Sequence, residues 1–139
     1  MAMTRFSTAH LDSAPQVKAP DGSTVSILLS LSGGSMAQFE LQPGQVSQAV
    51  VHRTVEEIWF VVAGAGDMWR SQSGVEEVTP LQPGTCLTLP VGTRFQFRAS
   101  AAEGLKAVAI TLPPWPGDGE AVWVDGPWTA SAASSVSGG

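Results

Sequence analysis

The segment QAVVHRTVEEIWFVVAGAG, residues 48–66, places one histidine, His52, five positions before a glutamate, Glu57. The run from 56 to 63 is rich in β-branched and aromatic residues, and a Gly-x-Gly sequence follows it, so we expect a strand and then a hairpin turn. Because side chains alternate along a strand, Glu57 shares a face with Trp59. A polar pair beside a hydrophobic strand raises the question of whether the segment holds a metal ion.

Signals for tight turns punctuate the chain at spacings of roughly 8–12 residues, which is typical of a sandwich or barrel. Between them lie short alternating runs, and no window keeps the helical period over several turns. The pattern predicts an all-β domain with at most a short helical turn within residues 8–14. The expected strands are 23–31, 35–41, 46–52, 56–63, 66–71, 84–90, 93–99 and 105–112.

The composition argues against several classes of function. A net charge of −5 opposes binding to nucleic acid, which needs clustered Lys and Arg. No segment is basic and amphipathic, and no apolar run approaches the roughly 20 residues of a spanning helix, so we expect no membrane association. A single cysteine, Cys86, allows no intrachain disulfide and favours the cytoplasm. It lies in a strand beside two leucines, so we expect an inert buried thiol.

The tetrapeptide LQPG occurs twice, at 41–44 and at 81–84. Each copy stands at the start of a strand–turn–strand unit, as if one half of a two-layered structure were repeated. Jelly rolls are built from two Greek keys, so the repeat favours a jelly-roll barrel.

Residues around these repeats resemble the two sequence motifs of the cupin superfamily. The first motif is G-x5-H-x-H-x3,4-E-x6-G. Gly44, His52, Glu57 and Gly64 fall on its positions, and Val50 replaces the first histidine. The resemblance implies a double-stranded β-helix, the cupin jelly-roll barrel, with a ligand site inside.

The second cupin motif is G-x5-P-x-G-x2-H-x3-N. It fits at Gly84, Pro90 and Gly92, whereas Phe95 and Ala99 replace its histidine and asparagine. The resemblance implies a metal held by three His and one Glu, and in this sequence two of those four ligand positions are apolar.

The remaining candidates for metal ligands are His52, Glu57 and Gln48. Strand alternation puts Gln48 on the same face as His52, and its amide oxygen is a weak ligand. Such a set predicts either no cofactor or a weakly bound divalent metal: Zn, Fe, Mn or Ni.

We expect His52 and Glu57 to be catalytic, because an imidazole and a carboxylate in an apolar cavity perturb each other's protonation. With Glu57 as general base and His52 as general acid or base, the pair would serve an isomerase, a lyase or a decarboxylase. A degenerate metallo-cupin (oxygenase-like or a metal-dependent lyase), a non-catalytic module that binds a small ligand, and a purely structural His–Glu contact are the alternatives. The predicted substrate contacts are Gln48, Val50, Trp59, Phe95 and Phe97.

Composition also suggests how the chain is divided. We expect an N-terminal arm at 1–25, the barrel at 26–113, a Pro- and Trp-rich C-terminal arm packed on the barrel at 114–130, and a disordered tail at 131–139. The tryptophans of the C-terminal arm would pin it to the barrel or to a second subunit. The strand at 56–63 is apolar on its outward face as well, which predicts a homodimer formed through this sheet.

Overall fold

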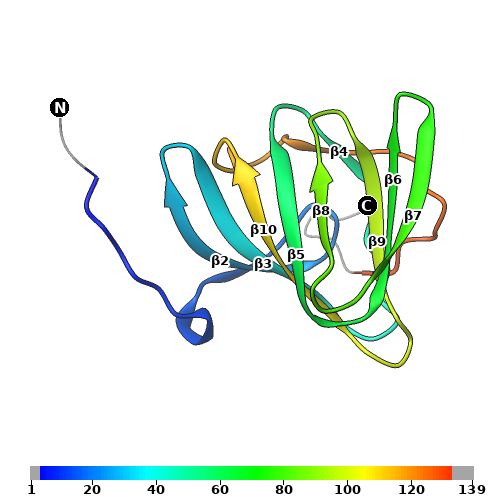
Figure 1. The fold of residues 1–139 in the computed structure, drawn as a ribbon, viewed down its shortest axis with the longest axis horizontal. Helices are drawn as coiled ribbons and strands as arrows, with labels where there is room; N and C mark the ends of the chain where they lie inside the picture. The colour runs from blue at the N-terminus through cyan, green and yellow to red at the C-terminus, as the bar shows by residue number, and fades with distance from the viewer. Residues whose placement is uncertain (1–3, 133–139) are drawn as a thin grey trace.

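In the computed structural model, which describes residues 4–132, two antiparallel β-sheets face each other (Figure 1). The six-stranded sheet has the order β1-β2-β3-β10-β5-β8, and the five-stranded sheet has the order β11-β4-β9-β6-β7. The chain passes repeatedly from one sheet to the other, as a jelly roll requires. The predicted all-β double-stranded β-helix is confirmed.

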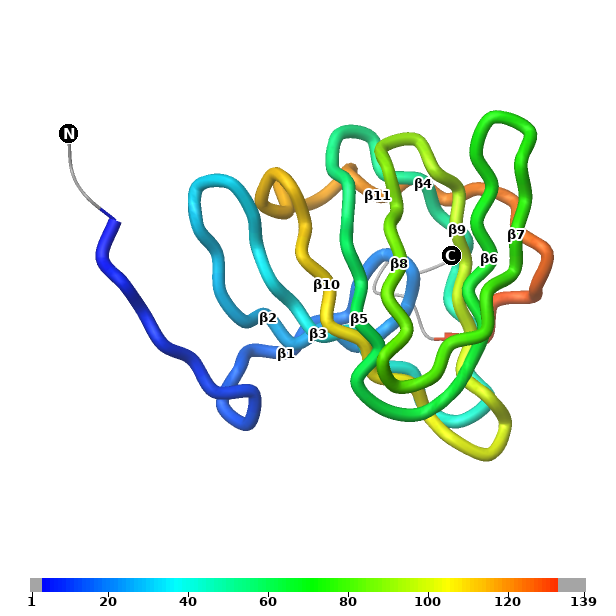
Figure 2. Tube along the Cα trace, in the orientation of Figure 1, coloured from blue at the N-terminus to red at the C-terminus, as the bar shows by residue number. Residues whose placement is uncertain are grey.

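The strands of the first sheet are β1 (Gln16–Lys18), β2 (Thr24–Leu31), β3 (Gly34–Leu41), β5 (Glu56–Gly64), β8 (Cys86–Leu89) and β10 (Leu105–Leu112). Those of the second are β4 (Val50–His52), β6 (Gly66–Gln72), β7 (Val75–Leu81), β9 (Arg94–Ala99) and β11 (Ala121–Trp123). Figure 2 follows the C-terminal arm to β11, which pairs with β4. The helical element in the described range is a 3₁₀ turn, η1 (Leu11–Ser13), inside the segment expected to form one. Over residues 4–132, no helix has the length and apolar character needed to cross a bilayer.

β5 lies between β10 and β8 in the six-stranded sheet. Its side chains alternate regularly between the buried inner face and the exposed outer face. Glu57, Trp59 and Val61 are buried, whereas Ile58 and Phe60 on the outer side are each 49% exposed. The inward row supplies the polar residue of the site, and the outward row leaves an apolar surface.

The repeated LQPG sequence forms the same turn twice. The amide of the residue after each glycine donates to the carbonyl oxygen of the glutamine, at 3.0 Å for Gln45 and 2.9 Å for Thr85. Gly44 and Gly84 have φ of 78° and 97°, and a proline followed by such a glycine is typical of a type II turn. The sequence repeat therefore corresponds to a structural repeat.

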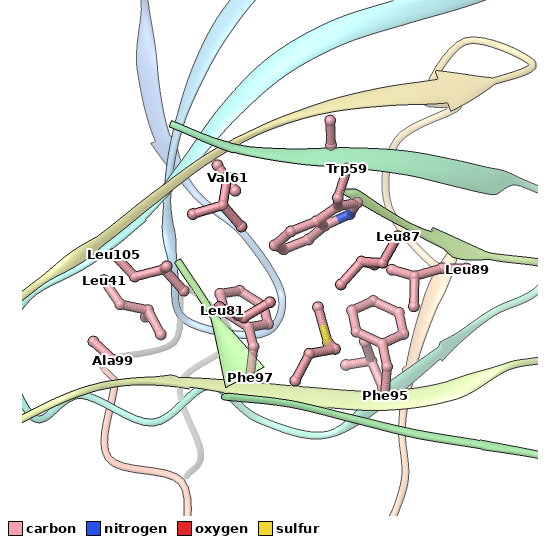
Figure 3. Close-up of a cluster of buried hydrophobic side chains, with 14 residues drawn as sticks. Leu41, Trp59, Val61, Leu81, Leu87, Leu89, Phe95, Phe97, Ala99 and Leu105 are labelled. Atoms are coloured by element: carbon pink, nitrogen blue, oxygen red, sulfur yellow. The ribbon is translucent and has the colours of Figure 1, made fainter. Parts of the chain in front are cut away.

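A hydrophobic core lies between the two sheets (Figure 3). Trp59 of β5 contacts Phe97 of β9 edge to face, with ring centroids 5.0 Å apart. Fully burying a large apolar side chain of this kind contributes about 2 kcal/mol. The core consists of Leu41, Val50, Trp59, Val61, Met68, Leu81, Leu87, Leu89, Phe95, Phe97, Ala99, Leu105, Ala107 and Ala109.

The last part of the C-terminal arm, around Gly126 and Trp128, packs on the outer face of the five-stranded sheet. Gln96, which is buried on that face, donates to Trp128 O at 2.8 Å and accepts from Trp128 N at 3.1 Å. The guanidinium of Arg98 lies 4.0 Å from the centre of the Trp128 ring, which is a cation–π contact. Most of the predicted disordered tail, residues 133–139, lies outside the described range.

Two local predictions are wrong. Gly64 and Gly66 do not close a hairpin, because β5 and β6 belong to different sheets. A Cβ at either position would collide with a carbonyl oxygen, that of Gly104 or of Arg98, so close backbone approach explains the glycines. Cys86 is exposed, because its neighbours in β8 take the inward positions.

Candidate functional site

His52 and Glu57 come from different sheets and meet between them. His52 is the last residue of β4, Glu57 is the second residue of β5, and the short connection between them carries the chain from one sheet to the other. His52 Nδ1 lies 3.8 Å from Glu57 Oε1, and both side chains are buried. The structure therefore brings together the two polar residues that the sequence singled out.

Two donors hold the Glu57 carboxyl group. Trp59 Nε1 donates to Oε1 at 3.2 Å, and Thr111 Oγ1 donates to Oε2 at 3.0 Å. Burial raises the pKa of Glu57 to about 7; the two hydrogen bonds lower it, and the charge of Asp21 raises it. Glu57 therefore changes its protonation near neutral pH, which suits a group that exchanges protons with a substrate.

The His52 ring is enclosed by aromatic side chains. Phe95 and Trp115 meet it edge-on, with centroids 5.1 and 5.0 Å away. Burial lowers the pKa of His52 to about 4, although the charge of Glu120 acts in the opposite direction. Within residues 4–132 the ring nitrogens of His52 make no hydrogen bond, so they remain available to a ligand.

Glu120 of the C-terminal arm fixes the connection between β4 and β5. Its carboxylate accepts hydrogen bonds from Thr54 N at 2.7 Å, from Thr54 Oγ1 at 2.6 Å and from Val55 N at 3.0 Å. Burial acts to raise the pKa of Glu120, but these hydrogen bonds and the nearby His52 outweigh it and keep the pKa below its ordinary value. An ionised Glu120 thus holds the segment that carries both site residues.

A cavity of about 990 Å³ opens beside the pair. Its walls come from the inner face of the six-stranded sheet, from His52 and Phe95 of the five-stranded sheet, from residues 17–21 and from the C-terminal arm. Trp123 Nε1 donates to Pro20 O at 2.9 Å and so joins these two terminal segments. The volume suits a small organic molecule. The main polar and aromatic lining residues are Asp21, Phe39, His52, Glu57, Trp59, Phe95, Thr111, Trp115 and Trp123.

The five residues predicted to contact a substrate do not all reach the cavity. Trp59 and Phe95 line it. Val50 and Phe97 belong to the hydrophobic core, where Val50 of β4 pairs with Phe95 of β9.

Gln48, the fifth of these residues and the weak metal-ligand candidate, lies outside the cavity lining. Its Nε2 donates to Ala49 O and to Val124 O, at 3.2 Å each. β4 begins only at Val50, so the alternation that would place Gln48 beside His52 does not extend that far.

Sequence reasoning missed four residues of the site: Asp21, Thr111, Trp115 and Glu120. Thr111 could have been predicted to point inward, because it holds an inward position in the alternating strand β10. In the structure it pairs with Glu57. Asp21 belongs to a PDG turn, which predicts the turn and says nothing of a buried side chain.

The donors present do not fit a tightly bound first-row metal. In the part of the chain described, no three His, Cys, Asp or Glu side chains are grouped so that they could hold an ion. Val50 and Phe95, at two positions where the cupin motifs carry histidine, are apolar and buried. Zinc and similar ions take three or four protein ligands, so His52 and Glu57 alone form an incomplete set.

Two facing antiparallel sheets with a ligand-sized cavity between them define a small jelly-roll barrel built around an internal site. The chain belongs to the cupin family: the family model described as Cupin domain matches residues 37–111, more than half of the chain. No curated protein sequence matches it.

Several solved structures share this fold. KdgF from Halomonas sp. aligns with a TM-score of 0.66 at 19% identity, over 77% of this chain and 94% of its own. A Streptomyces Pac13 variant with uridine gives a TM-score of 0.68 at 16% identity, over 88% and 92% of the two chains. A variant of oxalate decarboxylase from B. subtilis gives 0.74 at 11% identity, over 89% of this chain and 34% of its own. Identities this low establish the common fold alone.

Proposed function

We propose that this cupin is a small-molecule enzyme whose chemistry is proton transfer by Glu57, with His52 orienting the substrate. One observation carries the proposal: a buried imidazole and a buried carboxyl group, 3.8 Å apart, on the wall of a cavity of about 990 Å³. Burial disfavours the charged form of each group, so the Glu57 carboxylate is a stronger base here than it would be in water.

Glu57 is the group that carries the proton. Its pKa of about 7 means that the carboxylate and the acid are both populated near neutral pH, where proton transfer is most effective. His52 is neutral there because its pKa is about 4, so it orients the substrate with one ring nitrogen that donates a hydrogen bond and one that accepts.

Three reaction types fit such a carrier. In an isomerisation, the Glu57 carboxylate removes a proton from carbon and the acid returns it to another carbon. In an elimination, the C–H electron pair forms a double bond and the proton leaves with the departing hydroxyl as water. In a decarboxylation, the acid form protonates the carbanion that remains after loss of CO₂. Pac13 is described as a nucleoside dehydratase, so in that protein a barrel of this fold hosts an elimination.

The incomplete donor set favours this metal-free mechanism over a degenerate metallo-cupin. The aromatic lining of the cavity also suits a non-catalytic module that binds a small ligand, which is the second candidate. The two differ in whether a bound ligand is turned over.

A screen in D₂O tests the proposal. Small metabolites are incubated with the protein, and NMR detects deuterium incorporation or a new product. We expect turnover that falls by about 100-fold in Glu57→Gln and clearly in His52→Gln. Glu56→Gln, an exposed neighbour, is the matched control and keeps full activity. Ligand binding with no turnover would instead support the binding module, and turnover that survives in Glu57→Gln would exclude the proposed role.

We also propose that two copies pair through the outer face of the six-stranded sheet. Ile58, Phe60 and Val62 are 49%, 49% and 40% exposed there, and Met36 on β3 is 37% exposed. An exposed apolar sheet face of this kind typically marks a protein interface.

A further inference from the structure

Aromatic rings wall the cavity. Phe39 stacks on Trp59 with centroids 5.2 Å apart and planes inclined by 5°. Trp115 and Trp123 of the C-terminal arm line the same space. Ring faces of this kind stack on flat ligands and attract cations through their quadrupole.

The charges around the cavity are unequal. The titratable side chains that face it are Lys18, Asp21, His52, Glu57 and Asp118. Lys18 and Asp118 are exposed, and Lys18 Nζ donates to Thr24 Oγ1 at 3.0 Å. Asp21 and Glu57 are only 6% and 2% exposed, so the deeper part of the cavity holds two carboxyl groups and, among residues 4–132, no Lys or Arg.

Neither buried carboxyl group has a basic partner. Among residues 4–132, no Lys or Arg forms an ion pair with Asp21 or Glu57. Ser23 N and Ser23 Oγ donate to the same oxygen of Asp21, Oδ1, at 2.9 and 2.6 Å. Burial raises the pKa of both carboxyl groups, and the charge of Asp21 raises that of Glu57 further. Glu120, which acts on His52, adds negative charge nearby.

We propose that the cavity selects an organic cation: a ring compound that carries a protonated amine. The ammonium group binds between Asp21 and Glu57, and the ring packs against Trp59 and Trp115. His52, buried and without a hydrogen bond in the described range, is left to contact a second polar group of the ligand. This inference rests on the proposed function, because it names the ligand class of the same cavity.

The same arrangement disfavours ligands whose net charge is negative, so a substrate for decarboxylation would have to carry an ammonium group as well as its carboxylate. A carboxylate or phosphate would lie beside two buried carboxyl groups, with only the exposed Lys18 to offset them. Like charges brought together in a poorly hydrated space repel strongly. A cation, in contrast, would favour the ionised forms of Asp21 and Glu57 and would bind the more tightly for it.

A series of probes with one ring and three charges tests the inference on the unmodified protein. Phenethylamine is positive, phenylacetamide is neutral and phenylacetate is negative near neutral pH. Calorimetric titration at low salt should give affinities in that order, with phenethylamine at least about tenfold tighter than phenylacetate. Its affinity should also rise from about pH 6 to about pH 8, as Glu57 ionises.

Variants then locate the effect. Asp21→Asn should weaken phenethylamine binding by about tenfold and change phenylacetamide binding by less than about twofold. Asp12→Asn, in the exposed η1 turn, is the matched control and should change neither. A change in the indole N–H resonance of Trp59 on addition of phenethylamine would place the probe in this cavity.

The inference is overturned if phenylacetate binds as tightly as phenethylamine, or if phenethylamine does not bind at about 10 mM. These results differ from a failure of the proposed function. If an anionic substrate is turned over in a Glu57-dependent way, the proposed enzyme function holds and the proposed preference for cations fails. If phenethylamine binds but the D₂O screen finds no Glu57-dependent turnover, the preference for cations holds and the proposed enzyme function fails.

Discussion

Glu57 and Thr111 occupy paired positions on β5 and β10, and the threonine hydroxyl donates to the carboxyl oxygen at 3.0 Å. The bond connects two inward positions of neighbouring strands, so the orientation of Glu57 depends on sheet register rather than on a mobile loop. With the indole of Trp59 on the other oxygen, both carboxyl oxygens are held while one side stays open to His52 and the cavity.

Replacing Thr111 should change the proton affinity of Glu57. Thr111→Val keeps the shape and removes the donor, so the pKa of Glu57 should rise above about 7 and stability should fall by about 1 kcal/mol. The indole N–H resonance of Trp59, which donates to Glu57, reports the titration by NMR. Thr111→Ser keeps the hydroxyl and should leave the midpoint close to that of the unmodified protein. An unchanged midpoint in Thr111→Val would mean that this hydrogen bond does not tune Glu57.

The two buried groups should give opposite dependences of stability on pH. The pKa of Glu57 rises from 4.5 to about 7 on folding, so the folded state holds an extra proton and stability falls as pH rises through that window. The pKa of His52 drops from 6.5 to about 4, so its contribution is lost as pH falls through that range. Between about pH 5 and 6.5 the two slopes oppose each other.

Single variants separate these slopes. Relative to the unmodified protein, the free energy of unfolding of Glu57→Gln should rise with pH by about 1.4 kcal/mol per pH unit in the shared window, and that of His52→Gln should fall similarly. Urea unfolding at a series of pH values measures both, and the differences cancel the other titrating groups. Parallel curves for all three proteins would contradict the assigned pKa directions.

The strands that the sequence analysis did not predict lie at the edges of the sheets. β1, β7 and β11 are each the last strand of a sheet, and their residues are largely exposed. An edge strand exposed on both faces does not alternate between apolar and polar residues, so periodicity cannot detect it. β7 also contains Pro80, which edge strands tolerate and central strands exclude.

The residues of the site also fall into those that the sequence could predict and those that it could not. His52 and Glu57 are close in sequence, and their motif spacing made them visible. Asp21 and Glu120 reach the site from the two ends of the chain, through a buried turn and through the C-terminal arm. No local pattern encodes such approaches, because they depend on how the terminal segments fold over the finished barrel.

Glu120 should prove important for stability although it touches no reacting atom. Removing a carboxylate that accepts three hydrogen bonds leaves Thr54 and Val55 without an acceptor, so Glu120→Ala should cost about 2 kcal/mol in urea unfolding. Glu56→Ala, an exposed change in the next strand, should stay within about 0.5 kcal/mol. Equal effects of the two substitutions would show that Glu120 does not hold the β4–β5 connection.

The proposed dimer makes a prediction about Phe60. Phe60→Glu introduces a charge in the middle of the exposed apolar face, so it should shift the protein toward monomer in analytical ultracentrifugation. Val75→Glu changes a residue that is 67% exposed in the other sheet and should leave the mass unchanged. A monomeric unmodified protein at high concentration would rule out this interface.

Restoring the missing histidines should create a metal site. Val50 and Phe95 are paired across β4 and β9, and Phe95 contacts the His52 ring with centroids 5.1 Å apart. Val50→His with Phe95→His would therefore place three imidazoles near Glu57, a set that suits Zn²⁺ or Ni²⁺. After dialysis with Zn²⁺ and washing, elemental analysis should find about one atom per chain in the double variant and less than about a tenth in the unmodified protein. Stoichiometric zinc in the unmodified protein would show that His52 and Glu57 recruit ligands absent from this arrangement. If a correctly folded double variant binds no zinc, the two strands do not hold these positions in ligand geometry.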